Sequence, residues 1–415
     1  MSLIVLFGEN NMKDKNILFL QVLFPNLDKE ENLYSHLAEE FVNQGYNVYV
    51  VTIQDFIGDK DLKMNTYIEM QKGINILRVH TPTKYFNTNF VEKGVTTLLI
   101  PYLYSKNIKK FLNGIKFDIV ISISIIPGLY KVIKNIKKLY NSQVYILLRD
   151  MFPQMANDMG ILPKFMYEYF LRQQIKLYNI GDIIGCMSPG NIDYVKNNLP
   201  QVEYNKLKLL PNWRTVSNKV IDNNIDFREK YNLQNKIIAI FGGVLGIQQG
   251  LDFLLELAEE MQRYEELVFI LIGNGTEKDK LKKICLEKSL KNVIIFDRIP
   301  SSEYEAALRQ CDIGLINLHG NLTVPHIPSK TLSYLEAGIP ILAATDKNTD
   351  YGDVLEEMGA GLWCEYKDLH KYKENMEYML DEVNRKKMGN KGKEYLLSNL
   401  QTDIIVKEIF KQLNN

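Results

Sequence analysis

Residues 328–340 read PSKTLSYLEAGIP, and this stretch decides how the fold of the chain is interpreted. Its Pro-Ser opening is followed by residues that form helices well. The pattern therefore predicts a helix whose first backbone N–H groups have no partner within it. Gly338 and Pro340 end that helix. The apolar run at 339–344 then predicts a short buried strand, so the stretch contains one helix-to-strand step of an α/β fold.

The two ends of the predicted helix carry side chains that suit a nucleotide diphosphate. Ser329 and Lys330 lie at its start, where free N–H groups, the positive end of the helix dipole and an ammonium group would meet two phosphates. Glu336 lies near its end, where a carboxylate could accept both hydroxyl groups of a ribose. Taken alone, the stretch fits a nucleotide site and an ordinary surface helix with a good N-cap equally well.

Strand-like apolar runs alternate with helical patterns along the whole chain, which predicts parallel sheets with right-handed crossovers. Strands are expected near 16–21, 47–52, 74–79, 118–122, 144–148, 182–187, 237–241, 267–272, 293–296, 313–316, 339–343 and 361–364. Since 415 residues are too many for one ordinary core, we predict two doubly wound α/β domains, 1–213 and 214–398. A helix at 399–415 could complete the first domain. Ligands are expected in the cleft between the carboxyl ends of the strands.

The composition argues against several function classes. Hydrophobic residues make up 46% and charged residues 24%, as in globular proteins. Lysine and arginine number 50, as do aspartate and glutamate, which argues against a general nucleic-acid binder. The four cysteines form no Cys-x-x-Cys pair, and no apolar run reaches membrane-spanning length. These features predict a cytoplasmic protein. Met12, which precedes Lys-Asp-Lys, is a second candidate start.

Further turns at strand ends in the second half would also expose backbone. Glycines there let a backbone bend sharply or approach a ligand, although a tight strand-to-helix turn needs glycine as well. Because these turns follow strands of one sheet, their amides could together hold a base, a ribose and two phosphates. The residues expected to contact such a donor are Gly242, Gly243, Gly246, Gln249, Gly273, Asn274, Arg298 and Ile299.

In their order, these motifs resemble glycosyltransferase family 4, the retaining enzymes of the GT-B fold. The resemblance covers nearly the whole chain and rests on the segments at 242–250, 273–275, 296–300, 312–315 and 336–340. Two features are similar to the N-acetylfucosamine-transferase-like branch of bacterial O-antigen and capsule assembly. Pro328-Ser329-Lys330 replaces the start of the family's Glu-x7-Glu motif, and RDMFP at 149–153 looks like the branch's Arg-Asp-x-Trp-Pro motif.

The resemblance implies two Rossmann-like domains that face each other across a cleft, the second of which binds a nucleotide-sugar. It implies UDP as the nucleotide, an N-acetylated hexosamine as a candidate sugar, retention of configuration, and no cofactor or bound metal. The chain departs from the family where Val244 and Gln249 stand in place of the usual Arg and Lys. It also has Pro328 in place of the first Glu, whose usual contact to a sugar hydroxyl is then missing.

Cleavage of the bond between a sugar and a diphosphate places growing negative charge on the departing phosphate. Preorganised hydrogen-bond donors aimed at that phosphate are the natural catalytic device. The groups assigned to the diphosphate are Lys330, the amides of Ser329 and Gly243, and the side chains of Arg214 and Arg298, and Thr331 is a further expected contact to the donor. Lys330 is the first of two predicted catalytic residues.

The first domain is expected to bind the acceptor. Asp150, the second predicted catalytic residue, follows a strand and could orient or deprotonate the acceptor hydroxyl. It could equally hold Arg149 in a structural ion pair. Glu31 and Asn32 follow the first strand at the same sheet edge, and His326 precedes the Pro-Ser-Lys helix. These residues are further candidate acceptor contacts.

The region 101–150 is strongly basic. It holds nine basic residues against two acidic ones, a net charge of +7. Apolar residues at 132–140 recur at helical spacing among lysines, and Tyr102 and Tyr104 lie nearby. Such a region could dock on anionic lipid, or it could be a solvated helix packed on the sheet.

The leading hypothesis is a cytoplasmic hexosyltransferase at the inner face of the cell membrane. It would move a sugar from a UDP-sugar to a lipid-linked or glycan acceptor in the synthesis of a surface polysaccharide. A UDP-sugar 2-epimerase of similar fold stays open as an alternative, although the second-domain loops contain no clear set of histidine and carboxylates. A non-catalytic protein that binds nucleotide-sugars also stays open, because the family's Arg, Lys and first Glu are missing.

Overall fold

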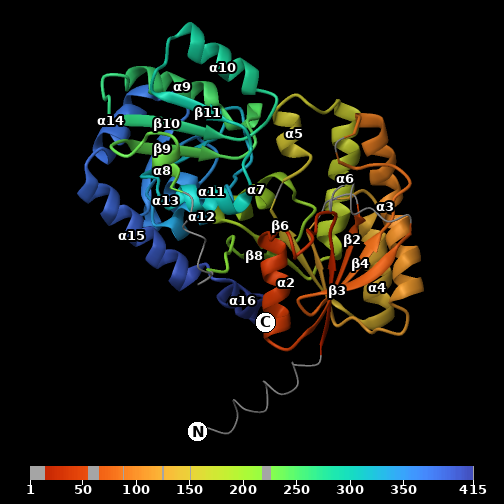
Figure 1. The fold of residues 1–415 in the computed structure, drawn as a ribbon. Coiled ribbons are helices and arrows are strands. Elements are labelled where there is room, and N and C mark those ends of the chain that lie inside the picture. The colour runs from red at the N-terminus through yellow and green to blue at the C-terminus, as the bar shows by residue number, and fades with distance from the viewer. Residues whose placement is uncertain are drawn as a thin grey trace. The chain divides into compact units, whose positions relative to one another are not determined.

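The computed structural model describes residues 15–54, 65–86, 88–123, 126–149, 151–216 and 226–414. The chain divides into two compact units (Figure 1). The first comprises Met1–Pro153, Leu162–Pro211 and Thr402–Asn415, and the second comprises Gln154–Ile161 and Asn212–Gln401. The main division after Pro211 lies close to the predicted one after residue 213. Residues 154–161, however, belong to the second unit, whereas the sequence analysis assigned them to the first.

Hydrogen bonds explain why residues 154–161 join the second unit. The short helix α5 (Gln154–Asp158) ends at Asp158, whose carboxylate accepts hydrogen bonds from the N–H and the hydroxyl of Thr323, each at 2.8 Å. The two residues are 165 positions apart in the sequence. Local sequence patterns do not indicate a contact between residues so far apart in the chain.

The first unit contains an eight-stranded sheet in the order β3-β4-β2-β1-β5-β6-β7-β8. Its strands are β1 (Asn16–Leu20), β2 (Asn47–Ile53), β3 (Tyr67–Gln71), β4 (Ile74–Val79), β5 (Ile119–Ser122), β6 (Gln143–Leu148), β7 (Ile183–Cys186) and β8 (Leu207–Leu209). All neighbours pair in parallel except β3 and β4. The six predicted strands are confirmed because their apolar runs are buried on both faces, as a covered parallel sheet requires.

Strands β3 and β8 were not predicted. Strand β3 alternates between exposed and half-buried residues at the edge of the sheet. It pairs with β4 through a tight turn at Lys72 and Gly73, whose φ angles of 48° and 77° fit a two-residue hairpin. Strand β8 spans only three residues. Neither strand has the continuous apolar run on which the predictions rested.

The helices of the first unit cover its sheet. They are α2 (Leu33–Asn43), α3 (Phe90–Phe111), α4 (Leu129–Tyr140), α6 (Lys164–Ile180), α7 (Pro189–Asn198) and α16 (Thr402–Asn414), with the 3₁₀ turn η3 (Tyr204–Lys206). The C-terminal helix α16 packs on α2, and Phe410 stacks on Tyr46 with ring centroids 4.7 Å apart. It therefore completes the first unit. None of the helices in the described ranges is both long and apolar enough to span a bilayer.

The second unit contains a six-stranded parallel sheet in the order β11-β10-β9-β12-β13-β14. Its strands are β9 (Ile237–Gly242), β10 (Leu267–Ile272), β11 (Val293–Phe296), β12 (Ile313–Asn317), β13 (Ile341–Thr345) and β14 (Gly361–Glu365). All six were predicted to within two residues. This is the doubly wound order of nucleotide-binding folds, in which ligands bind outside the carboxyl ends of the strands. Two doubly wound units are thus confirmed.

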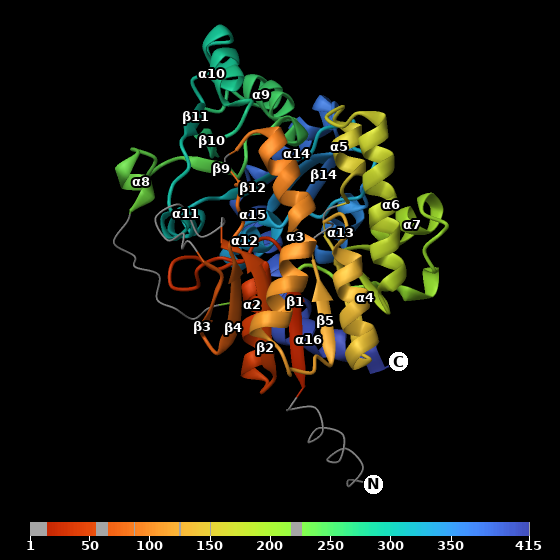
Figure 2. The same cartoon turned by 90° about the vertical axis from the view of Figure 1, so that its right-hand side faces the viewer.

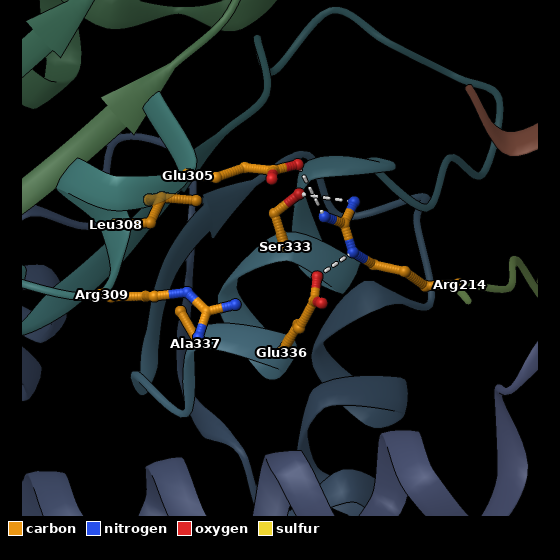
Figure 3. A pocket seen from close by; sticks show the side chains of 7 residues that line it. All are labelled: Arg214, Glu305, Leu308, Arg309, Ser333, Glu336 and Ala337. Atoms are coloured by element: carbon orange, nitrogen blue, oxygen red, sulfur yellow. Dashed lines mark hydrogen bonds and ion pairs between the residues drawn. The ribbon is translucent and has the colours of Figure 1, made fainter. Parts of the chain in front are cut away.

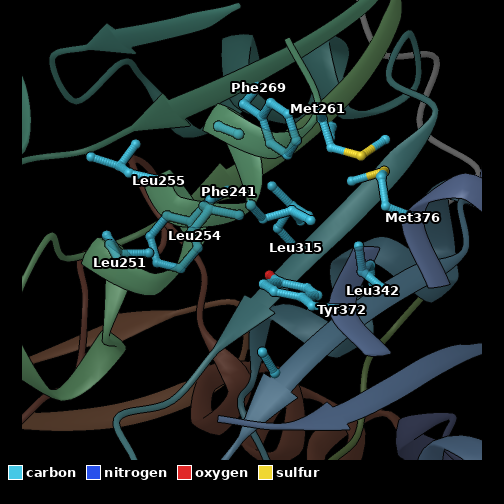
Figure 4. Packing of buried hydrophobic residues seen from close by; sticks show 14 of the residues in the cluster. Phe241, Leu251, Leu254, Leu255, Met261, Phe269, Leu315, Leu342, Tyr372 and Met376 are labelled. Carbon is cyan, nitrogen blue, oxygen red and sulfur yellow. The ribbon is translucent and has the colours of Figure 1, made fainter. Parts of the chain in front are cut away.

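In the described part of the second unit, the helical segments besides α5 surround this sheet. They are α8 (Phe227–Lys230), η4 (Ile247–Gln249), α9 (Leu251–Glu260), α10 (Lys278–Glu287), α11 (Ser301–Leu308), α12 (Lys330–Ala337), α13 (Tyr351–Met358), α14 (Leu369–Met379) and α15 (Glu382–Asn399). The core lies between the sheet and α9 and α14, where Phe241, Leu254, Phe269 and Tyr372 are fully buried (Figure 4). This packing fixes the ends of β9 and β10, and hence the glycine loops that follow them.

Candidate nucleotide site

Helix α12 begins at Lys330, as predicted, and ends at Ala337. The next residue, Gly338, has a φ of 71° and forms the left-handed cap that favours glycine. Ser329 is exposed and caps no N–H group with its side chain. Within the described part of the chain, the N–H groups of Ser329 and Lys330 have no hydrogen-bond acceptor. The start of α12 therefore offers two backbone donors at the positive end of a helix.

The Lys330 ammonium lies close to the core and is only partly reached by solvent. It donates a hydrogen bond to Oε1 of Gln249 at 2.8 Å and lies 3.7 Å from the centre of the Phe241 ring. No carboxylate among the described residues pairs with it. Burial lowers the pKa of Lys330 to about 7. An ammonium in this position attracts an anion strongly, because neither water nor a nearby protein charge weakens the interaction between them much.

Thr331 has a different role from the predicted one. Its N–H donates to the Pro328 carbonyl at 3.1 Å, and its buried hydroxyl is hydrogen bonded to the Tyr351 hydroxyl at 2.7 Å. Both polar groups are therefore used within the fold. Thr331 anchors the start of α12 and does not present a free donor to a diphosphate.

The Gly243 amide was also assigned to the diphosphate, and the structure corrects this assignment. Its N–H donates to the Ile272 carbonyl at 3.0 Å, where the loops after β9 and β10 meet. A Cβ at Gly273 would lie 1.8 Å from the Gly243 carbonyl oxygen, so residue 273 must be glycine. A Cβ at Gly243 would lie 3.8 Å from Nζ of Lys330. Gly243 therefore contributes open space beside the ammonium, not a donor.

Three other predicted donor contacts have local partners. Gly242 faces Tyr304, whose hydroxyl would lie 2.0 Å from an added Cβ, and Gly246 faces the side chain of Gln248. Asn274 accepts a hydrogen bond from Nζ of Lys278 at 2.9 Å. Arg298 is exposed and Ile299 half-buried on the segment between β11 and α11. These residues shape the loops at the carboxyl edge of the sheet.

Arg214 contacts the far end of α12 from Lys330 (Figure 3). Its Nε donates to Glu336, its Nη1 to the Ser333 hydroxyl at 3.4 Å, and its Nη2 to Glu305 at 3.1 Å. These residues line a small pocket together with Leu308, Arg309 and Ala337. Arg214 was predicted to meet the diphosphate. It instead fixes the carboxylate that was predicted to accept a ribose.

The candidate acceptor residues Glu31 and Asn32 have partners within the first unit. Asn32 caps α2, since its side chain accepts from the N–H groups of Tyr34 and Ser35 at 3.0 and 2.9 Å. Burial raises the pKa of Glu31, but hydrogen bonds and charge from Lys72 and His36 outweigh this and lower it to about 2. Both side chains thus have partners within the first unit, and their predicted contact to the acceptor stays a prediction.

Arg149 is buried where β6, β7 and β8 end. Its Nη1 donates to the carbonyls of Leu148 and Gly185 at 3.0 and 3.3 Å, and its Nη2 to that of Pro211 at 3.5 Å. It thus joins three segments of the first unit. Asp150 lies outside the described residues, so its two predicted roles stay predictions. His326 lies in the second unit, where its N–H donates to the Thr349 hydroxyl at 3.1 Å.

Asp346 is a residue at the ligand edge that was not among the predicted site residues. It follows β13 directly and is 1% exposed. Its Oδ1 accepts from the N–H groups of Asn348 and Thr349, each at 2.9 Å, while its Oδ2 has no partner among the described residues. Burial, and to a smaller extent the charge of Asp158, raises the pKa of Asp346 to about 6. Its position directly after an apolar strand was the available signal.

The described residues contain no group of three or more His, Cys, Asp or Glu side chains placed to hold a metal ion. The expectation that the reaction needs no metal stays a prediction. The parts of the site that the structure brings together are the start of α12, Gln249, Phe241 and the two glycine loops. They lie at the carboxyl edge of one parallel sheet, where doubly wound folds bind ligands.

Comparison with known proteins relates the second unit to a family. Residues 223–395 match the family model described as Glycosyl transferases group 1. A probable glycosyltransferase, WbjE of Pseudomonas aeruginosa, is 26% identical over 223 residues, which are 53% of this chain and 55% of the relative. A putative colanic acid biosynthesis glycosyl transferase, WcaI of Escherichia coli K12, is 28% identical over 150 residues, 35% of this chain and 37% of the relative. The chain thus spans about half or less of the length of these curated relatives.

Solved structures establish the fold. WaaG, a glycosyltransferase involved in lipopolysaccharide biosynthesis, superposes with a TM-score of 0.66 at 14% identity, over 94% of this chain and 98% of that one. HepE of Anabaena, in complex with UDP, superposes with a TM-score of 0.64 at 13% identity, over 96% and 99%. The fold is GT-B, the two-domain Rossmann-like architecture of these glycosyltransferases, as predicted. The comparisons do not single out the N-acetylfucosamine-transferase-like branch.

Proposed function

We propose that this protein is a retaining hexosyltransferase of the N-acetylfucosamine-transferase-like branch, which uses a UDP-linked sugar. The sugar is an N-acetylated hexosamine, and the acceptor is lipid-linked or a glycan in the synthesis of a surface polysaccharide. One observation carries the proposal. Among the described residues, the largely desolvated Lys330 ammonium has no carboxylate partner, and the N–H groups of Ser329 and Lys330 at the start of the same helix have no acceptor, inside the segment that matches the family model. Relatives named as glycosyltransferases support it.

The chemistry follows from this cluster. When the bond between the anomeric carbon and the phosphate oxygen breaks, negative charge grows on the diphosphate. The Lys330 ammonium and the N–H groups of Ser329 and Lys330 receive that charge without rearrangement of the protein. One such donor lowers a barrier by roughly 3 to 4 kcal/mol in other enzymes. The acceptor hydroxyl attacks on the face that the leaving group departs from, and its proton passes to the departing phosphate or to Asp150, the proposed base.

The absence of the family's Arg and Lys from the first glycine loop is compensated by Lys330. Gln249 stands where the family has Lys, and its side-chain oxygen holds the Lys330 ammonium at 2.8 Å. The positive charge beside the first glycine loop thus comes from Lys330 of α12 and not from a residue of the loop itself. This arrangement favours a catalytic protein over a purely binding one, because the charge is aimed at the carboxyl edge of the sheet.

The ribose is proposed to bind at the second turn of α12. Glu336 would accept its hydroxyl groups, and the ion pair with Arg214 would fix the rotamer of that carboxylate. Arg214 is then a positioning residue. This assignment replaces its predicted contact to the diphosphate.

The test is a donor screen. The protein is incubated with a panel of UDP-sugars and a polyprenyl-diphosphate-linked acceptor, and UDP release is measured for wild type and Lys330→Ala. Lys371→Ala, which removes an exposed lysine of α14, is the matched control. We expect a loss of about 100-fold or more only in Lys330→Ala. Equal release by both variants would remove Lys330 from its role.

The same screen separates the remaining alternatives. A new sugar formed without an acceptor would identify an epimerase. UDP binding without turnover on any donor and acceptor would identify a binding protein. A lipid-linked acceptor would bring the protein to the inner face of the cell membrane, where the basic region 101–150 is proposed to help.

A further inference from the structure

Helix α3 carries an apolar stripe on its solvent side. Val91, Val95, Leu98 and Tyr102 are between 44% and 73% exposed, and their spacing of four, three and four residues places them on one face of the helix. The opposite face holds the buried residues Ile100, Tyr104 and Ile108. A monomeric protein seldom exposes a continuous apolar stripe without using it.

The stripe differs from the surface expected from the sequence. Tyr104 was a candidate lipid contact, but it is buried and its hydroxyl donates to the Gln21 carbonyl at 2.6 Å. Most apolar residues of α4, including Val132, Ile133 and Ile136, are likewise buried against the unit, whereas Leu139 is 71% exposed. Only Tyr102 of the candidate aromatic residues faces solvent.

The basic part of the expected surface does continue the stripe. Lys106 and Lys109 follow Tyr102 by four and seven residues, so they lie on the same face of α3 and are exposed. On the neighbouring helix α4, Lys131, Lys134 and Lys138 are exposed as well. No carboxylate among the described residues pairs with any of these five lysines. Their charge is left for an external partner.

A third helix extends the apolar part. Phe165 and Tyr169 are exposed in the first turns of α6, four residues apart. Helices α3, α4 and α6 lie next to one another on the first unit (Figure 2). Each leads into the next parallel strand, so all three run opposite to the strands and begin at the carboxyl edge of the sheet. The apolar residues of α3 and α6 therefore lie toward that edge, with the lysines of α3 farther from it.

We propose that the exposed faces of α3, α4 and the start of α6 form a surface that docks on an anionic lipid bilayer. The apolar side chains would enter the headgroup region, with Tyr102 at its boundary, and the five lysines would contact anionic headgroups. A second copy of this chain fits less well, because its identical lysines would repel these. The proposed function supplies the reason for docking, a lipid-linked acceptor. The docking itself requires no turnover.

The test is flotation of the full chain with vesicles, without any sugar donor. We expect the protein to float with phosphatidylcholine vesicles that contain phosphatidylglycerol, but not with phosphatidylcholine alone. Added salt should release it. Leu98→Asp should abolish flotation, and Lys106→Glu/Lys109→Glu should lower the partition coefficient onto the vesicles at least about fivefold per lysine. Leu286→Asp, at an 80% exposed leucine of α10, is the matched control and should float like wild type.

Some results would overturn the proposal. These are flotation with neither vesicle, equal flotation with both, or equal loss in Leu286→Asp. A wild-type dimer that Leu98→Asp converts to a monomer would show that the face joins two copies. Because all substituted side chains are exposed, each variant should melt like wild type. Failure here leaves UDP release unaffected, so it is distinct from failure of the proposed function.

Discussion

At the scale of single residues, the protonation of Lys330 is the property most open to measurement. Burial over Phe241 lowers its pKa to about 7, so near neutral pH the free protein is a mixture of ammonium and amine. A diphosphate needs the ammonium and will raise that pKa when it binds. Binding is therefore coupled to proton uptake above pH 7.

We expect UDP to bind about tenfold more weakly at pH 8 than at pH 6 for this reason. Calorimetry in buffers of different ionisation enthalpy should show uptake approaching one proton at pH 8. The guanidinium of Lys330→Arg stays charged, so this variant should take up one proton fewer than wild type when it binds UDP at pH 8. Identical uptake by wild type and Lys330→Arg would contradict the assignment.

Asp346 gives a second prediction at this scale. Its pKa is raised from 3.8 to about 6, so the fold disfavours its ionised form. The stabilisation it gives is present below about pH 4 and is lost as the pH rises through 6, by about 3 kcal/mol in total. Asp346→Asn keeps an acceptor for the N–H groups of Asn348 and Thr349 without the charge. We expect this variant to melt several degrees above wild type at pH 7.5 and with little difference at pH 4.5. A lower melting temperature at pH 7.5 would contradict this view.

At the scale of elements, α12 has two functional ends. Its start offers the Lys330 ammonium and two backbone N–H groups, and its second turn carries Glu336, which forms an ion pair with Arg214. The two ends are expected to act on different parts of one nucleotide, which substitutions can separate.

Arg214→Ala should weaken UDP binding about tenfold but leave pyrophosphate binding unchanged, because only the ribose contact depends on Glu336. Lys330→Ala should weaken both ligands. The measurement is calorimetry with each ligand, and Arg309→Ala, on the same pocket, is the control. If Arg214 only stabilised the fold, Arg214→Ala would weaken the binding of UDP and of pyrophosphate to the same extent.

The glycine loops are the second element-scale feature. Gly273→Ala should destabilise the second unit by roughly 2 to 4 kcal/mol, because its Cβ would overlap the Gly243 carbonyl and push apart the loops after β9 and β10. Gly94→Ala on α3, where an added Cβ meets nothing within 4 Å, should be neutral or slightly stabilising. Thermal melts compare the two. Equal melting temperatures would mean that the loops can separate at little cost.

At the scale of the whole molecule, the chain returns at its end to the unit where it began. Helix α16 covers α2 and supplies Phe410 to a cluster with Phe41 and Tyr46, while Gln412 accepts a hydrogen bond from Tyr145 at 2.6 Å. The stability of the first unit thus depends on the last residues of the chain.

Phe410→Ala should cost the first unit about 3 to 5 kcal/mol, since it removes a buried aromatic ring. The second unit should keep its own transition. Differential scanning calorimetry of the full chain resolves the two, with Val383→Ala, an exposed residue of α15, as the control. A loss confined to the second transition would contradict the division into units.

The sequence by itself determined the alternation of strands and helices, twelve strands of the two sheets, and the helix that begins at Lys330. These features follow from hydrophobic periodicity and caps, which are properties of neighbours in the chain. Strands β3 and β8 were not predicted because neither has a continuous apolar run. The tertiary structure alone decided that the Gly243 amide is used, that Arg214 holds Glu336, and that Lys330 loses its proton easily. Hydrogen-bond partners and desolvation come from segments far apart in sequence, and no local pattern encodes them.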